Sequence, residues 1–197
     1  MTPMDVPEDL LGERVVVRRP RWADAEALWQ AVDSSRAHIG RWMAWPRHYT
    51  SLDNAFDFVA RRNAAWDPRG ERQMLIFERH DQRLLGGIGL NPLPRSVRAF
   101  EVGYWLRQDA EGRGYMRESV QLVTRLAFGP LQASRVAIRV HPENLRSRRV
   151  AEGLGFQVEG IARKAGIGAD GEPVDLVMHA LTREDLPSIA WARDLID

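Results

Sequence analysis

The sequence predicts a single α/β domain built on one mixed sheet. Two observations favour this fold class. The length of 197 residues suits one domain with a sizeable core. Short β-branched runs also alternate with longer stretches whose apolar residues have helical spacing. The expected order is strand, two helices, three strands, helix, strand, helix and two strands, which is typical of a layered α/β sheet.

The first part of the chain is expected to contain one strand and two helices. Val15, Val16 and Val17 form the β-branched core of a strand over residues 14–19. In residues 22–32 the apolar side chains recur on one helical face. Ser51 is placed to cap a second helix.

The remaining elements follow from changes in apolar spacing and from glycine positions. Strands are expected at residues 73–78, 84–90, 98–107, 135–140, 157–166 and 174–181, and helices at about 113–128 and 144–154. Residues 1–12 are expected to be an N-terminal extension, 13–186 the domain and 187–197 a C-terminal tail.

Composition excludes several classes of function. A net charge of +1 gives no general reason to expect nucleic acid or a membrane surface as partner. The chain has no cysteine, which excludes disulfides, thiolate metal sites and a covalent cysteine intermediate. Neither a signal-peptide pattern nor an apolar run of ~18 residues is present. We therefore expect a cytoplasmic protein.

The stretch DAEGRGYMRES places two glycines, Gly112 and Gly114, between an expected strand and helix. Glycine lets the backbone approach an anion closely, and the first amides of a helix have no intrahelical acceptor, so this turn could hold a phosphate. A P-loop is excluded because no Gly-Lys-Ser/Thr follows, and a dinucleotide fingerprint is excluded because Arg117 stands at its third glycine. An ordinary glycine-containing turn fits the two glycines equally well.

Two longer stretches resemble motifs of the GNAT N-acetyltransferases. FEVGYWLRQDAEGRGYMRESV (100–120) resembles their acyl-coenzyme A motif, Gln/Arg-x-x-Gly-x-Gly/Ala, with Asp109 at the Gln/Arg position. NLRSRRVAEGLGF (144–156) resembles their Asn-x-x-Ser…Gly-Phe helix. Within this family, the chain further resembles the RimJ/RimL branch, which acetylates the amino termini of ribosomal proteins. The stretches that are similar to this branch are RWMAWPRHYTSLDNAFDFV (41–59), VGYWL and EGIARKAGIGADGEPVD (159–175).

The resemblance covers about residues 15–185 and implies a GNAT-type domain. Its sheet would be central, mixed, mostly antiparallel and twisted, with about seven strands, flanking helices and a splay between the fourth and fifth strands. It also implies acetyl-CoA as cosubstrate, no metal, and a homodimer. The cofactor-binding residues it implies are Tyr104, Trp105, Leu106, Gly112, Arg113, Gly114, Tyr115, Met116, Asn144 and Ser147.

Without cysteine, the acetyl group must pass directly to the amine in a ternary complex. Neutralising an α-amino group at pH 7 costs about 1 kcal/mol, whereas a lysine costs over ~4 kcal/mol, so an amino terminus needs only a modest base. Glu101 is the candidate general base, because the resemblance implies it: carboxylates in this strand often act as the base in the family. A solvated strand charge is the alternative.

Ser147 is the candidate proton donor to the leaving thiolate, and a serine bonded to a helix carbonyl is its alternative. The branch sometimes carries a catalytic Glu where this chain has Gly166. Trp42, Trp45 and His48 are candidate substrate-binding residues, although such tryptophans more often pack in a core or lid. The five histidines show no metal-ligand spacing.

The resulting interpretation is an acetyl-CoA-dependent N-acetyltransferase acting on a protein amino terminus, such as that of a ribosomal protein. Two alternatives remain open at this point. One is acetylation of a small amine such as an antibiotic or a polyamine. The other is a non-catalytic acyl-CoA-binding module.

Overall fold

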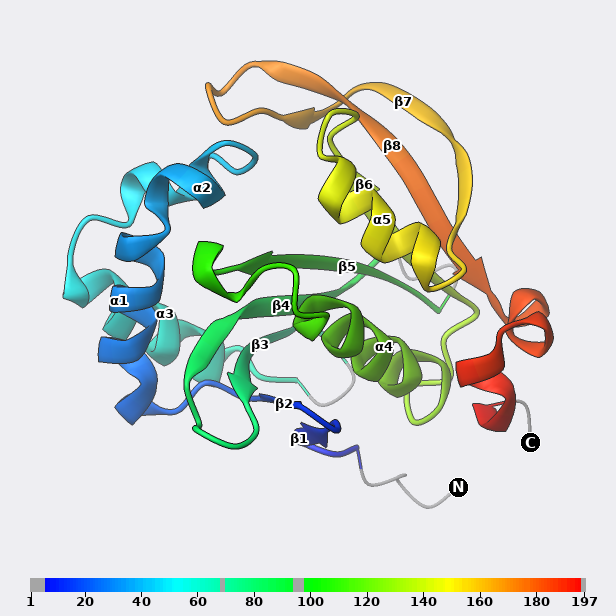
Figure 1. Cartoon of the computed structure of the whole chain (residues 1–197), viewed down its shortest axis with the longest axis horizontal. Helices are drawn as coiled ribbons and strands as arrows, with labels where there is room; N and C mark the ends of the chain where they lie inside the picture. The colour runs from blue at the N-terminus through cyan, green and yellow to red at the C-terminus, as the bar shows by residue number, and fades with distance from the viewer. Residues whose placement is uncertain (1–5, 68–69, 94–97, 196–197) are drawn as a thin grey trace.

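The computed structural model describes residues 6–67, 70–93 and 98–195, in which eight strands form one sheet with helices on both faces (Figure 1). The strand order along the sheet is β1-β2-β3-β4-β5-β6-β8-β7. All neighbouring strands are antiparallel except β5 and β6, which are parallel. The expected mixed, mostly antiparallel sheet is confirmed. Residues 1–5 of the expected extension and 196–197 of the expected tail lie outside the described residues.

The strands agree closely with the expected runs, apart from one addition at the sheet edge. They are β1 Asp9–Leu11, β2 Val15–Arg18, β3 Arg72–Glu78, β4 Leu84–Pro92, β5 Ala99–Leu106, β6 Arg135–Val140, β7 Gln157–Ile167 and β8 Pro173–Thr182. The unexpected strand is β1, which pairs with β2 through Leu10 and Val17. Three residues are too few to show an alternating pattern, although Leu10 is buried.

The helices are α1 Ala25–Ser34, α2 Arg36–Gly40, α3 Leu52–Ala64, α4 Tyr115–Phe128 and α5 Leu145–Gly153. Short 3₁₀ turns are η1 Trp22–Asp24, η2 Trp45–His48, η3 Gln108–Ala110, η4 Arg183–Ser188 and η5 Ala190–Leu195. Ser51 occupies the N-cap of α3 as expected, and its N–H donates to the Asn54 side chain at 3.0 Å. The sequence did not predict α2, a single turn that buries only Ile39.

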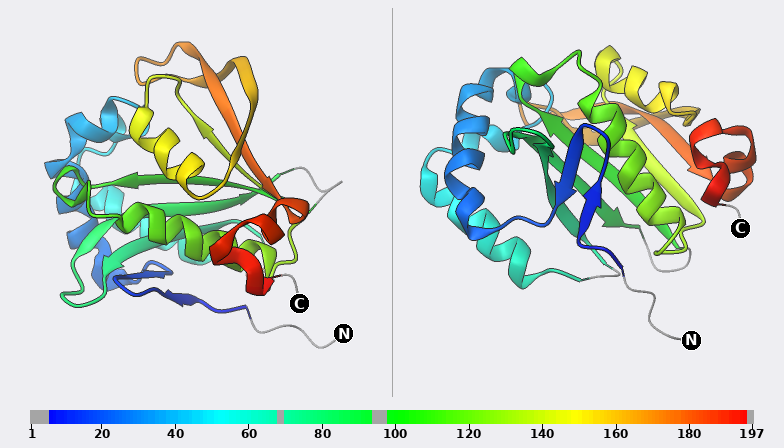
Figure 2. Two further views of the ribbon diagram at one scale, coloured as in Figure 1. Left: turned by 45° about the vertical axis from the view of Figure 1, so that its right-hand side comes forward. Right: turned by 60° about the horizontal axis from the view of Figure 1, so that its bottom comes forward.

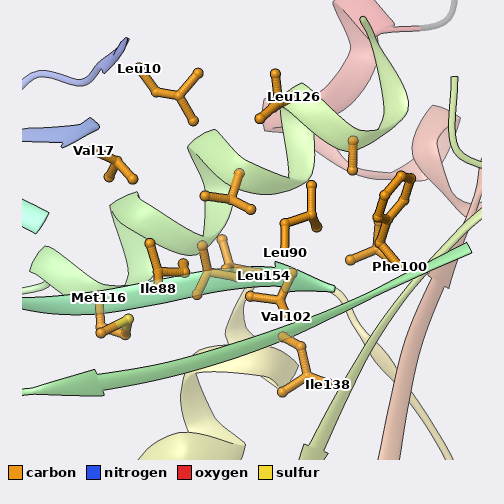
Figure 3. Packing of buried hydrophobic residues seen from close by; sticks show 14 of the residues in the cluster. Leu10, Val17, Ile88, Leu90, Phe100, Val102, Met116, Leu126, Ile138 and Leu154 are labelled. Atoms are coloured by element: carbon orange, nitrogen blue, oxygen red, sulfur yellow. The ribbon is translucent and has the colours of Figure 1, made fainter. Parts of the chain in front are cut away.

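Two apolar clusters attach the helices to the two faces of the sheet. The larger joins one face to α4 and α5, and Figure 3 shows its packing. The smaller joins the other face to α1 and α3, and Figure 2 shows the two helix layers on opposite sides. Side chains alternate between the clusters along β3: Met74 and Ile76 lie in the larger, Leu75 and Phe77 in the smaller.

The parallel pair β5 and β6 separates shortly after it begins. Their paired residues are Ala99–Glu101 and 135–137, and β6 continues along β8 instead. From Val102 to Leu106, β5 therefore has a strand partner only on its β4 side within the described residues. Figure 1 shows the two strands diverging, with α5 beside β6. The expected splay between the fourth and fifth predicted strands is therefore present. Because β1 adds one strand at the start of the sheet, these two strands are numbered β5 and β6.

Candidate active site

The two glycines of the turn after β5 both have left-handed backbone conformations. Gly112 has φ +74° and Gly114 has φ +80°, a region that L side chains rarely adopt. Gly114 is the N-cap of α4, and no side chain caps this helix. Its first amides therefore remain without a side-chain acceptor, at the positive end of the helix dipole. The helix begins at Tyr115, two residues later than expected.

Arg14 anchors the turn through its guanidinium group. Its Nη1 donates to the carbonyl of Arg113 at 2.8 Å, and its Nε lies 3.0 Å from Oε2 of Glu118. A Cβ added at Gly114 would lie 2.9 Å from Arg14 Nη2, whereas one added at Gly112 would meet nothing within 4 Å. Arg14 therefore packs against the turn at Gly114, whereas the described residues leave the space beside Gly112 open.

Asp109, at the Gln/Arg position of the motif, is bound by arginines. Arg107 donates from Nε and Nη2 at 3.0 and 3.1 Å, and Arg83 contacts the same carboxylate. Partial burial of the carboxyl acts to raise its pKa, but the hydrogen bonds and charges of Arg107 and Arg83 outweigh it and hold the pKa below its usual value. Positive charge at this position therefore comes from Arg83, which directly precedes β4, and Arg107, which directly follows β5.

Tyr104, Trp105 and Leu106 lie on the part of β5 that has no β6 partner. Opposite them, Asn144 caps α5, and its side chain accepts from the Ser147 N–H at 3.2 Å. The Tyr104 hydroxyl reaches across to Ser147, 2.9 Å from its Oγ. The structure therefore brings the two predicted motifs together on either side of the splay.

Tyr115 and Met116 contribute to the core through their side chains. Both are buried, and the Tyr115 hydroxyl donates to the Glu78 carboxylate. Only their backbone amides in the first turn of α4 are oriented to bind an anion.

Glu101 forms an ion pair with Arg139, a residue that no sequence motif singled out. Arg139 donates from Nε to Oε2 at 2.6 Å and from Nη2 to Oε1 at 3.0 Å. Gly103, two residues along β5 on the same face, has no atom within 4 Å of where a Cβ would lie. The face that carries Glu101 is thus open immediately beside it.

The three candidate substrate-binding residues lie in different surroundings. The centroid of the Trp42 ring lies 5.4 Å from that of the His141 ring, and His141 belongs to the loop between β6 and α5. The Trp45 ring is 5.9 Å from that of Trp105, so it packs against the sheet. His48 is exposed, and its Nε2 accepts a hydrogen bond from Arg47 Nε at 3.1 Å.

A cavity of about 330 Å³ lies where the loop after β6 meets the β7–β8 hairpin. Its lining includes His141, Glu143, Arg163, Lys164 and Asp175. The hairpin is irregular here, because three residues of β7 lie opposite Asp175 alone between the pairs of Ala162 and Gly166. Sequence reasoning missed this cavity, since the bulge leaves no compositional signal.

Gly166 lies under a neighbouring side chain of the hairpin. A Cβ there would come within 2.8 Å of Leu176 Cδ1. A glutamate at this position would therefore need Leu176 to move.

Among residues 6–67, 70–93 and 98–195, no group of three or more His, Cys, Asp or Glu side chains is arranged to hold a metal ion. In the same part of the chain, no helix is both long enough and apolar enough to span a membrane.

Comparisons with known proteins agree with this geometry. A family model described as the acetyltransferase (GNAT) domain matches residues 14–157. YdaF of Bacillus subtilis, provisionally named a ribosomal N-acetyltransferase, is 30% identical over 89% of this chain and 94% of its own length. The ribosomal-protein-serine acetyltransferase of Escherichia coli is 25% identical over 70% of this chain and 76% of its own.

Solved structures show the same fold. RimL, a ribosomal L7/L12 α-N-protein acetyltransferase in complex with coenzyme A, matches with a TM-score of 0.81 and 23% identity, over 89% of this chain and 98% of its own. Mycobacterium smegmatis RimJ, in complex with a CoA disulfide, matches with a TM-score of 0.80 and 24% identity, over 91% of this chain and 87% of its own.

Proposed function

Since the chain belongs to the GNAT acetyltransferase family, we propose that it transfers an acetyl group from acetyl-CoA directly to the α-amino group of a protein. The observation that carries this proposal is the Gly112–Gly114 turn, which presents the uncapped amides of α4 beside the open edge of β5. The relatives named for ribosomal proteins support a protein substrate.

The turn and the open strand edge fit the two ends of coenzyme A. Amides at a helix N-terminus bind phosphate, so the pyrophosphate is held by the turn around Gly112 and Gly114. The pantetheine arm is an extended chain of amides, and it pairs with the backbone of β5 from Tyr104 to Leu106. Asn144 and Ser147 lie on the far side of the same opening.

Glu101 accepts the proton of the attacking amine. An ionised carboxylate offers about four lone-pair sites, and Arg139 occupies one on each oxygen. About two sites therefore remain for the amine or for a water between the amine and the carboxylate. With its pKa near 7.7–8.0, an α-amino group needs only this modest assistance.

Ser147 donates a hydrogen bond to the sulfur as the thiolate leaves. The acetyl carbon gains a bond to the amine nitrogen and loses its bond to sulfur, so the thiolate charge develops near the first turn of α5. Because the chain has no cysteine, no acetyl-cysteine intermediate precedes this step.

Mass spectrometry of cell-extract proteins and metabolites incubated with the enzyme and isotopically labelled acetyl-CoA tests the proposal. The label should appear on protein α-amino groups. Labelled small amines without labelled amino termini would contradict the proposed substrate, and an absence of label in any amine would contradict turnover itself. The Gly114→Val variant serves as the background control.

A further inference from the structure

The Tyr104 hydroxyl makes two contacts with one residue of α5. Its Oη lies 2.9 Å from the Ser147 Oγ and 3.1 Å from the Ser147 carbonyl oxygen. Tyr104 lies on β5 beyond Glu101, where the strand has left β6, and Ser147 lies in the first turns of α5. One phenol therefore bridges the two walls of the splay.

The two contacts allow two arrangements of protons. When Tyr104 donates to the Ser147 carbonyl, the Ser147 hydroxyl donates to the phenol oxygen, and its proton is then turned away from any other acceptor. When Tyr104 donates to Ser147 Oγ instead, the Ser147 proton is free to point elsewhere. The second arrangement is the one in which Ser147 can donate to a sulfur.

Tyr104 is a poor source of the proton itself. Burial raises the pKa of Tyr104 to about 12, although the hydrogen bond with Ser147 acts in the opposite direction. A thiol has a pKa of about 8.5, so transfer of the phenol proton to a thiolate is strongly uphill. Its contribution is therefore orientation.

We propose that Tyr104 is a positioning residue, whose hydroxyl donates to Ser147 Oγ and so directs the Ser147 proton toward the leaving thiolate. This inference rests on the role given to Ser147 in the proposed function. No proton is lost from Tyr104 in the step. When no sulfur is bound, the Tyr104 hydroxyl donates to the Ser147 carbonyl oxygen instead.

A double-mutant cycle on kcat tests the inference, with Tyr104→Phe, Ser147→Ala and the double variant. Tyr104→Phe should lower kcat about three- to tenfold, the range of one neutral hydrogen bond. The dissociation constant of coenzyme A, measured by calorimetry, should stay within about twofold, because the phenol is not a ligand. In the Ser147→Ala background, Tyr104→Phe should have no further effect on kcat.

Tyr49→Phe is the matched control, because its buried hydroxyl has no hydrogen-bond partner among the described residues; its kcat should match the wild type. Thermal melting identifies a variant that has lost structure, and assays well below each midpoint keep the comparison valid. An equal loss of kcat with and without Ser147 would overturn the positioning role, as would an unchanged kcat in Tyr104→Phe. If Ser147→Ala keeps the wild-type kcat, the role of Ser147 fails, and this inference fails with it.

Weakened coenzyme A binding by Tyr104→Phe would instead mean that the phenol holds α5 against the cofactor. That outcome overturns the inference while leaving the proposed function intact.

Discussion

Arg139 forms an ion pair with Glu101 at the point where β5 and β6 separate, and Arg139 Nε lies 2.6 Å from Glu101 Oε2. Glu101 is the last residue of β5 that pairs with β6, and Arg139 lies two residues beyond its partner Ala137. Arg139 Nη1 also lies 3.5 Å from the Ala165 carbonyl of the β7–β8 hairpin. The ion pair thus fixes the candidate base between the splay and the hairpin.

If Glu101 accepts the amine proton, Glu101→Gln should lower kcat about 10²–10⁴-fold, the usual range for a general base, with coenzyme A affinity nearly unchanged. The loss should shrink between pH 6 and 9, since more of the amine is then already neutral. Steady-state rates across this range measure both effects.

Glu159→Gln is the matched control, since Glu159 forms a similar ion pair with Arg135 between strands of the same sheet. Its rate should match the wild type. Wild-type activity of Glu101→Gln at every pH would make Glu101 a structural partner of Arg139 only.

Gly114→Val should weaken coenzyme A binding at least about tenfold. A Cβ at this position would stand 2.9 Å from Arg14 Nη2 at φ +80°, so the turn must shift away from its anchored position. Calorimetry with coenzyme A provides the measurement. Gly153→Ala is the control, because nothing lies within 4 Å of its Cβ position. Equal affinity in Gly114→Val and the wild type would show that the cofactor binds elsewhere.

Asp109→Asn should tighten coenzyme A binding about two- to fivefold, because a carboxylate beside the phosphate-binding turn repels the ligand by roughly 0.5–1 kcal/mol. The gain should fall as salt is raised. Asp194→Asn, which removes a comparable carboxylate from Arg125, should leave affinity unchanged. Weaker binding by Asp109→Asn would mean that Asp109 matters chiefly for holding Arg83 and Arg107.

His38 should make the protein less stable as the pH falls below 6.5. Its Nε2 lies 3.1 Å from Glu111, yet burial and then the charges of Arg146 and Arg41 lower its pKa from 6.5. Between 6.5 and that lower value the unfolded chain binds more protons than the folded one, so the free energy of unfolding decreases with falling pH. Urea midpoints at pH 7.5, 6.5 and 5.5 should show a smaller decrease in His38→Gln than in the wild type. Identical decreases would contradict this assignment.

Local features of this molecule could be read from the sequence, and long-range pairings could not. The glycines of the turn, Asn144 at the N-cap of α5 and Ser51 at that of α3 depend on neighbouring residues, which the sequence displays. The pairs Glu101–Arg139 and Tyr104–Ser147 are 38 and 43 residues apart. Their contact depends on strand register and on the position of α5, which spacing does not reveal. The homodimer and the cytoplasmic location stay predictions.

The central claim, transfer to an α-amino group, is tested most directly with two matched peptides in one reaction. One has a free amino terminus and no lysine; the other has a blocked amino terminus and a single lysine. Mass spectrometry after incubation with acetyl-CoA should find acetylation of the first peptide only, since the lysine amine costs about 3 kcal/mol more to neutralise at pH 7. Acetylation of the lysine peptide with the free amino terminus left unmodified would contradict the account.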